Sequence, residues 1–128
     1  NDFAVNTQNN HDVIKTQNGF LVVWNSLNQD LSGYGIFCRF FDNNGNKLGF
    51  ETQINTYTQY DQYLPSVTLL NNGSFMIVWQ SYGQNIQGYN DIYGQIIDDS
   101  AKKLGNEFLI FNETIEQVNF DLIFFNFI

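Results

Sequence analysis

Several residue types that functional sites often use are scarce in this chain. Among 128 residues there are one cysteine, one histidine and one proline. Because a disulfide needs two cysteines, an internal disulfide is excluded. The chain has five Lys and Arg residues and thirteen Asp and Glu residues, which gives a formal net charge of −8. Partners with a phosphate backbone or an anionic membrane surface are therefore disfavoured. The apolar stretch 124–128 is too short to span a bilayer.

Aromatic and amide side chains are abundant instead. Hydrophobic residues make up 43% and aromatic residues 17% of the chain, which is enough for one ordinary folded domain. There are 19 Asn and 11 Gln residues, which supply hydrogen bonding without charge. Such a surface suits lateral association or carbohydrate contact, and codon bias in an AT-rich genome is the alternative explanation.

The sequence repeats itself at an offset of 55 to 56 residues. Trp24 returns as Trp79 and Lys47 returns as Lys103. The matched segments are Asn18–Ser26 with Asn72–Ser81, 33–34 with 88–89, Ile36–Asp42 with Ile92–Asp98, and Lys47–Glu51 with Lys103–Glu107. A repeat of this length is one supersecondary unit that cannot bury its apolar surface alone. Recurring residues therefore indicate structure more than catalysis.

Each copy is predicted to form a four-stranded antiparallel β-sheet. We expect strands over 11–16, 20–26, 35–42 and 50–55, and again over 65–70, 74–80, 91–98 and 106–111. The dipeptides Asn18-Gly19 and Asn72-Gly73 predict hairpins with two-residue type I′ turns. The second strand of each copy is apolar on both faces, which is typical of a sheet covered on both sides. The expected fold is all-β, with propeller-blade-like or stacked sheets.

The ends of the chain fall outside the two copies. Asp2–Thr7 matches Glu51–Thr56, so residues 1–7 are expected to form an extra strand that pairs with a neighbouring repeat or protomer. We divide the rest into repeat 1 (8–56), repeat 2 (57–112) and an apolar strand or incomplete repeat (113–128). Because the chain lacks an initial Met and a signal-type stretch, we expect a processed chain or part of a longer one.

These residues resemble a family of tandem repeats of about fifty residues from large secreted and cell-surface proteins of bacteria and protists. The family pattern is Phe-Val-Val-Trp-x-Ser, Gly-Tyr-Gly-Ile, Phe-Asp, Gly-x-Glu and Asn-Thr. It is matched over about residues 1–112, at Trp24, Ser26, Gly33, Gly35, Phe41, Asp42, Gly49, Glu51, Asn55 and Thr56, and at Trp79, Ser81, Gly88, Gly94, Gln95, Asp98, Gly105 and Glu107. Phe111-Asn112 departs from it. The resemblance implies propeller-like blades and no particular activity.

Candidate catalytic groups are few. His11 is expected on the surface at the entrance of a strand, and no nucleophile elbow accompanies it. Glu51 and Glu107 could be imagined as a glycosidase pair, but they are repeat equivalents, which favours a structural role. Cys38 is expected to be a small buried residue. We therefore expect neither an enzyme nor a cofactor.

Candidate binding groups also have structural explanations. The segment Asp42–Asn46 is rich in oxygen ligands, like a calcium loop, but the distal Glu of an EF-hand is absent, so a turn is the favoured explanation and no metal is expected. Trp24 and Trp79 are expected in the core. Better candidates for a sugar site are tyrosines in irregular stretches, namely Tyr57, Tyr60, Tyr63, Tyr82 and Tyr89. The sequons at Asn72 and Asn112 are potential glycosylation sites.

The extra strand before the first repeat and the incomplete unit after the second predict assembly as the function. We expect a non-enzymatic extracellular or cell-surface structural protein that forms a fibril or filament with copies of itself by strand addition. The predicted interface residues are Phe3, Val5, Asn6, Phe120, Leu122, Phe124, Phe125 and Phe127. A glycan-binding adhesin module is the alternative function. Nucleic acid and membrane insertion are not expected.

Overall fold

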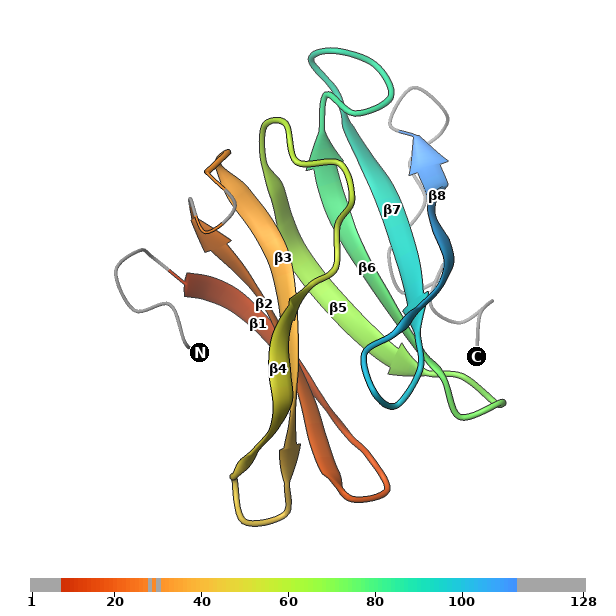
Figure 1. The fold of residues 1–128 in the computed structure, drawn as a ribbon. Helices are drawn as coiled ribbons and strands as arrows, with labels where there is room; N and C mark the ends of the chain where they lie inside the picture. The colour runs from red at the N-terminus through yellow and green to blue at the C-terminus, as the bar shows by residue number, and fades with distance from the viewer. Residues whose placement is uncertain (1–7, 28, 30, 113–128) are drawn as a thin grey trace.

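The computed structural model describes residues 8–27, 29 and 31–112, and these form two four-stranded antiparallel sheets (Figure 1). Sheet 1 has the order β1-β2-β3-β4 and sheet 2 has the order β5-β6-β7-β8. The strands are β1 Gln8–Lys15, β2 Gly19–Leu27, β3 Tyr34–Asp42, β4 Lys47–Gln53, β5 Gln62–Leu69, β6 Phe75–Tyr82, β7 Asn90–Ile97 and β8 Lys103–Asn112. The prediction of an all-β fold with two tandem four-stranded sheets is confirmed.

The last strand of each sheet begins three residues earlier than predicted because the ladder continues through a bulge. In β4, residues 49–51 lie opposite the single residue Arg39, and the glycine there has φ of 68°. The same bulge recurs in β8 at Gly105, opposite Gln95, with φ of 77°. Arg39 Nη2 donates to the Gly49 carbonyl at 2.7 Å, and Gln95 Nε2 donates to the Gly105 carbonyl at 3.1 Å. The bulge is therefore part of the repeat.

The two predicted hairpins form, but their turns are not of type I′. Asn72 lacks the positive φ that a type I′ turn requires, and Gly73 alone has it, at 85°. The loop has three residues, because the Leu70 N–H donates to the Ser74 carbonyl at 2.8 Å. In the first hairpin, position 19 requires glycine because there is no room for a side chain. A Cβ there would lie 2.0 Å from the Phe41 carbonyl oxygen.

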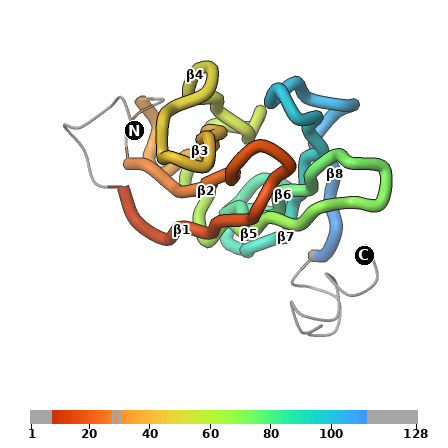
Figure 2. Tube along the Cα trace, turned by 90° about the horizontal axis from the view of Figure 1, so that it is seen from below, coloured from red at the N-terminus to blue at the C-terminus, as the bar shows by residue number. Residues whose placement is uncertain are grey.

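The sheets pack face to face, with β5 against the β1-β2-β3 side of sheet 1, and β1 and β5 lie side by side (Figures 1 and 2). Their shared core is formed by two sets of side chains. We call the set on sheet 1 its trailing face: Leu21, Val23, Ile36, Cys38, Phe40 and Ile54. We call the set on sheet 2 its leading face: Val67, Phe75, Ile77, Trp79, Tyr93 and Ile97.

Each sheet therefore has two apolar faces that are not alike. Side chains alternate between the two faces of a strand, and the strand registers of the two repeats match. The residues of sheet 1 that are equivalent to the leading face of sheet 2 therefore lie on the outer side of sheet 1. This leading face of sheet 1 consists of Val13, Phe20, Val22, Trp24, Phe37 and Phe41. The trailing face of sheet 2 lies on its outer side and consists of Met76, Val78, Ile92, Gly94, Ile96 and Ile110. The two sheets stack head to tail, trailing face on leading face.

Gly19→Ala is expected to destabilise the fold by about 2 kcal/mol or more, because β2 and β3 must separate to admit the methyl group. Gly73→Ala is the matched control, since a Cβ at Gly73 would have no atom within 4 Å and only the positive φ opposes it. We expect that control to cost roughly 1 kcal/mol. Urea unfolding followed by tryptophan fluorescence measures both. Equal losses would show that the close approach at Gly19 is unimportant.

Candidate functional site

The leading face of sheet 1 is an aromatic face on the outer side of the two-sheet stack. Trp24 and Phe37 are buried on it, at 7% and 5% exposed, and Phe20, Val22 and Phe41 are half-buried. Within residues 8–112, no strand packs over it. The Phe20 and Phe41 rings stack with centroids 5.4 Å apart, and Trp24 stacks on Phe37 at 6.5 Å. Val13 is 55% exposed, whereas its equivalent in sheet 2, Val67, is 7% exposed in the shared core. The face thus carries the side chains that form a core in sheet 2.

The trailing face of sheet 2 ends the stack on the other side. Met76 and Val78 are buried in a small cluster with Ile92, and β8 side chains pack against them. Gly94 occupies the place of Cys38, and a Cβ there would lie 2.8 Å from Ile110 Cδ1. Side chains of β8, among them Phe108 and Ile110, therefore lie close over this face.

Polar groups join the two sheets where the chain passes from one to the other. Asn55 Oδ1 accepts a hydrogen bond from the Ile36 N–H at 2.7 Å, and Asn55 Nδ2 donates to Gln62 Oε1 at 3.0 Å. Asp12 Oδ2 accepts from Ser66 Oγ and from the Val67 N–H, each at 3.0 Å. Sheet 1 is therefore held to β5 by bonds from its last strand end and from its first strand.

Glu107 supplies a third polar connection between the sheets. Its Oε1 accepts from the backbone N–H of Thr56 and, at 3.3 Å, from that of Tyr57. Its Oε2 accepts from Gln84 Nε2 at 2.5 Å, and Gln84 Oε1 accepts from Ser81 Oγ at 2.7 Å. The role of Gln84 was not predicted from the sequence. Gln84 is the repeat equivalent of Gln29, and this match is the signal that could have identified it.

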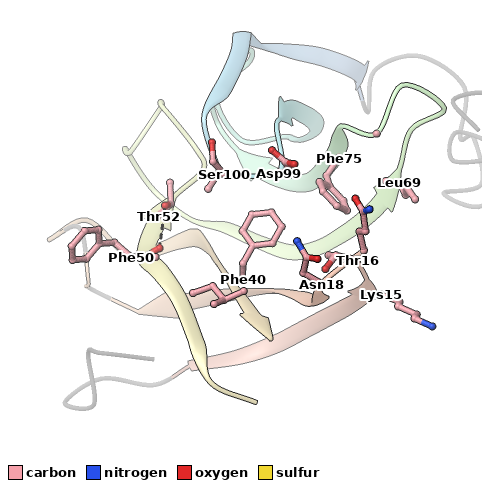
Figure 3. A pocket seen from close by; sticks show the side chains of 15 residues that line it. Lys15, Thr16, Asn18, Phe40, Phe50, Thr52, Leu69, Phe75, Asp99 and Ser100 are labelled. Carbon is pink, nitrogen blue, oxygen red and sulfur yellow. Dashed lines mark hydrogen bonds between the residues drawn. The ribbon is translucent and has the colours of Figure 1, made fainter. Parts of the chain in front are cut away.

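A cavity of about 760 Å³ opens between the sheets at their hairpin ends (Figure 3). Phe40 and Phe75 line it with rings that meet edge to face at 5.6 Å. Polar residues at its rim come from both sheets: Lys15, Thr16, Gln17, Asn18, Asp99 and Ser100. Its size suits a small ligand with an apolar body and a polar edge. No residue predicted as a binding site lines it.

The tryptophans, Cys38 and His11 differ in how far they are exposed. Trp79 is fully buried in the core and Trp24 is 7% exposed, which confirms their expected packing role. Cys38 is buried between the sheets, and this burial raises the pKa of its thiol to about 12. His11 is exposed, as expected, but it lies inside β1 beside an irregularity of the ladder rather than at the entrance of the strand, because β1 begins at Gln8. Among the described residues, no three His, Cys, Asp or Glu side chains form a group that could hold a metal.

The oxygen-rich segment after β3 is a turn. Asp42 Oδ1 accepts from the N–H groups of Asn44 and Asn46 at 2.9 and 2.8 Å. Asp98 does the same after β7, accepting from Ser100 and Lys102 at 2.9 Å each. Hydrogen bonds, first from the Ser100 hydroxyl, lower the pKa of Asp98. The shared bonding pattern supports the turn interpretation in both copies.

The candidate sugar-binding tyrosines separate into two groups. Tyr57 and Tyr63 are half-buried, and Tyr63 donates its hydroxyl hydrogen bond to Asn90 Oδ1 at 2.7 Å. Tyr60, Tyr82 and Tyr89 are exposed. The rings of Tyr60 and Tyr82 meet nearly at right angles, with centroids 5.9 Å apart. These two tyrosines from different segments form one exposed corner.

Other predicted sites are not settled by this geometry. All predicted interface residues lie outside the described residues: Phe3, Val5, Asn6, Phe120, Leu122, Phe124, Phe125 and Phe127. Asn72 is exposed in its hairpin, and its Oδ1 accepts from the Ser74 N–H at 3.1 Å. Asn112 is the last residue of β8. In the described part of the chain, no helix has the length and apolarity to cross a membrane.

Asp98→Asn tests the turn through its pH dependence. Because the folded pKa of Asp98 is lowered, its carboxylate stabilises the fold above the unfolded pKa, and this contribution is lost as the pH falls through the folded value. The stability advantage of the wild type over the variant should therefore be constant above about pH 5 and shrink as the pH falls below the unfolded pKa of about 3.9. Thermal unfolding at a series of pH values measures it. A difference that stays constant over the whole series would contradict this explanation.

Comparison with protein-family models, with curated proteins and with solved structures gave no match to this chain. The case for a function therefore depends on the geometry of its own repeat.

Proposed function

We propose that this chain is a non-enzymatic structural protein of the cell surface or extracellular space that assembles with copies of itself. One observation carries the proposal. The outer face at each end of the stack is the repeat equivalent of a face that is buried between the two sheets. Stacking the trailing face of sheet 2 in one copy on the leading face of sheet 1 in the next would repeat the type of contact found inside the chain.

The two outer faces differ, which determines the symmetry of such an assembly. A contact between unlike faces is heterologous and leaves one face of each kind open at the ends of every oligomer. Assembly continues into a filament unless the rotation per copy closes it. Propellers close with roughly four to eight blades, so a ring would contain about two to four copies of this two-sheet unit. We propose the open filament, as the sequence predicts.

Face stacking is the contact that the described residues support. The strand addition expected from residues 1–7 stays a prediction, because those residues are not described. In sheet 2 the fourth place is filled by β8 of the same chain. A strand from another copy would therefore have to add beyond β8 or replace it, whereas face stacking requires no rearrangement of the described strands.

Val13→Lys should weaken self-association by at least about tenfold, because stacking would bury an unpaired ammonium group. Val13 is 55% exposed, so the isolated chain should tolerate lysine there. Sedimentation velocity over a range of concentrations measures association, and negative-stain microscopy separates filaments from rings.

Phe50→Lys is the matched control for this prediction. Phe50 is 89% exposed and belongs to neither open face. It points away from the centre of the cavity in Figure 3. The control should associate like the wild type. The proposal fails if Val13→Lys assembles as well as the control does, or if the wild type stays monomeric at all concentrations.

Glycan binding is the second candidate function, favoured by the corner of Tyr60 and Tyr82. Tyr60 is 49% exposed and has a positive φ of 59°, a conformation that costs energy for a residue other than glycine. Gly83 makes room for it, since a Cβ there would lie 3.2 Å from the Tyr60 ring. Two perpendicular tyrosines offer an apolar face and hydroxyl groups, which together suit a sugar ring.

Tyr60→Ala and Tyr82→Ala test this second function on a glycan array. Reproducible binding by the wild type should fall by about tenfold or more in each variant, since each removes one wall of the corner. The exposed Tyr89→Ala is the control and should keep binding. Equal loss in all three variants, or no glycan bound by the wild type, would rule out the corner as the site.

A further inference from the structure

Glu107 connects its sheet to the end of the preceding one. It lies in the bulge of β8, and its carboxylate accepts hydrogen bonds from the N–H groups of Thr56 and Tyr57. Those two residues follow β4, the last strand of sheet 1. A charged acceptor paired with backbone donors is a strong and directional contact. It specifies the position of the sheets relative to each other more closely than apolar packing does.

Glu51 is the equivalent carboxylate in sheet 1. It lies in the matching bulge of β4, where residues 49–51 face Arg39, as residues 105–107 face Gln95 in sheet 2. It accepts a hydrogen bond from Gln29 Nε2, as Glu107 accepts one from Gln84. A bulge directs side chains differently from a regular strand, so its recurrence keeps both glutamates in equivalent positions.

The two glutamine–glutamate pairs differ in their surroundings. Gln84 Oε1 accepts a hydrogen bond from Ser81 Oγ at 2.7 Å. Gln29 Oε1 is buried and has no hydrogen-bond partner among the residues that the structure describes. Ser26, the equivalent of Ser81, instead accepts from Gln8 Nε2 at 3.3 Å. In sheet 1 the acceptor Gln29 Oε1 therefore lacks the hydrogen bond that its counterpart Gln84 Oε1 accepts in sheet 2.

We propose that Glu51, held by Gln29, is the docking residue for a second copy of this chain and accepts a hydrogen bond from the backbone N–H of Asn112, at the end of that copy's β8. This inference depends on the proposed function. Stacking the trailing face of sheet 2 on the leading face of sheet 1 repeats the contact inside the chain. It brings the end of β8, at Asn112, to the place that Thr56 takes beside Glu107.

Glu51 has the capacity for this contact. A carboxylate offers about four lone-pair positions and can accept from several donors at once, as Glu107 does from Thr56, Tyr57 and Gln84. Apolar stacking alone would permit neighbouring copies to slide or rotate over one another. The carboxylate fixes their register, so that every joint between copies has the geometry of the joint within a copy.

Glu51→Ala and Glu107→Ala separate the two roles of the equivalent residues. Both variants are made in the full chain, and each is measured by sedimentation velocity for association and by thermal unfolding for stability. Glu51→Ala should weaken association by about tenfold or more. It removes the bond from Gln29 but no contact between the sheets, so it should lower the melting temperature of the monomer less than Glu107→Ala does. Glu107→Ala should lower that melting temperature, because it removes a contact within the chain. Glu51→Gln, which keeps one carbonyl acceptor, should restore part of the association.

The outcomes distinguish this inference from the proposed function. If the wild type associates, Val13→Lys does not and Glu51→Ala associates like the wild type, face stacking stands and the docking role of Glu51 is wrong. If Glu51→Ala lowers the melting temperature as much as Glu107→Ala does, Glu51 is an intramolecular residue and the inference is also wrong. A wild type that remains monomeric overturns the proposed function and this inference together.

Discussion

The packing of the trailing face of sheet 1 on the leading face of sheet 2 is the contact on which the remaining structure depends. It buries Trp79 and Ile77 of sheet 2 with Leu21 and Ile36 of sheet 1, and it closes the only core that lies between two sheets in the described chain. Each sheet alone would leave both faces in water, because its second strand is apolar on both sides. Two sheets bury one pair of faces and leave one face of each kind at the ends.

Hydrogen bonds give this apolar contact its register. Asn55, Asp12 and Glu107 each bond across the joint, and all three satisfy backbone N–H groups or buried amides. Directional bonds of this kind add little net free energy individually, but leaving their buried partners unsatisfied would be costly. The joint is therefore both stable and defined in position. A structural unit that is repeated along an assembly needs both properties.

The fold could be predicted because the repeat and the strand pattern agree. Both faces of the sheets follow from the alternation of residues such as Leu21 and Val22, and the hairpins follow from their Asn-Gly signals. The turn types could not be predicted, because Gly19 is required by the approach of β3 rather than by its own φ. The start of β4 was also missed, since the sequence shows Gly49 but not the Arg39 bond that keeps the bulge in the ladder.

The candidate site was harder to predict, because it depends on how the two repeats of one chain pack against each other. The tryptophans were expected in the core, but the sequence does not show that Trp24 belongs to an outer face and Trp79 to an inner one. That difference depends on which face of each sheet meets the other. The polar connection through Gln84 and Glu107 is likewise formed only in three dimensions, by a loop, a bulge and a strand end.

Cross-linking between two variants that each carry one added cysteine tests the central claim most directly. Phe40 packs on Phe75 within the chain, so head-to-tail stacking places Ile96 of one copy against Phe20 of the next. A mixture of Phe20→Cys and Ile96→Cys proteins, treated with a thiol cross-linker of about 10 Å, the spacing of packed sheets, should form heterodimers. Cys38 is buried and should not react. Cross-links within each variant alone, or none in the mixture, would contradict head-to-tail stacking.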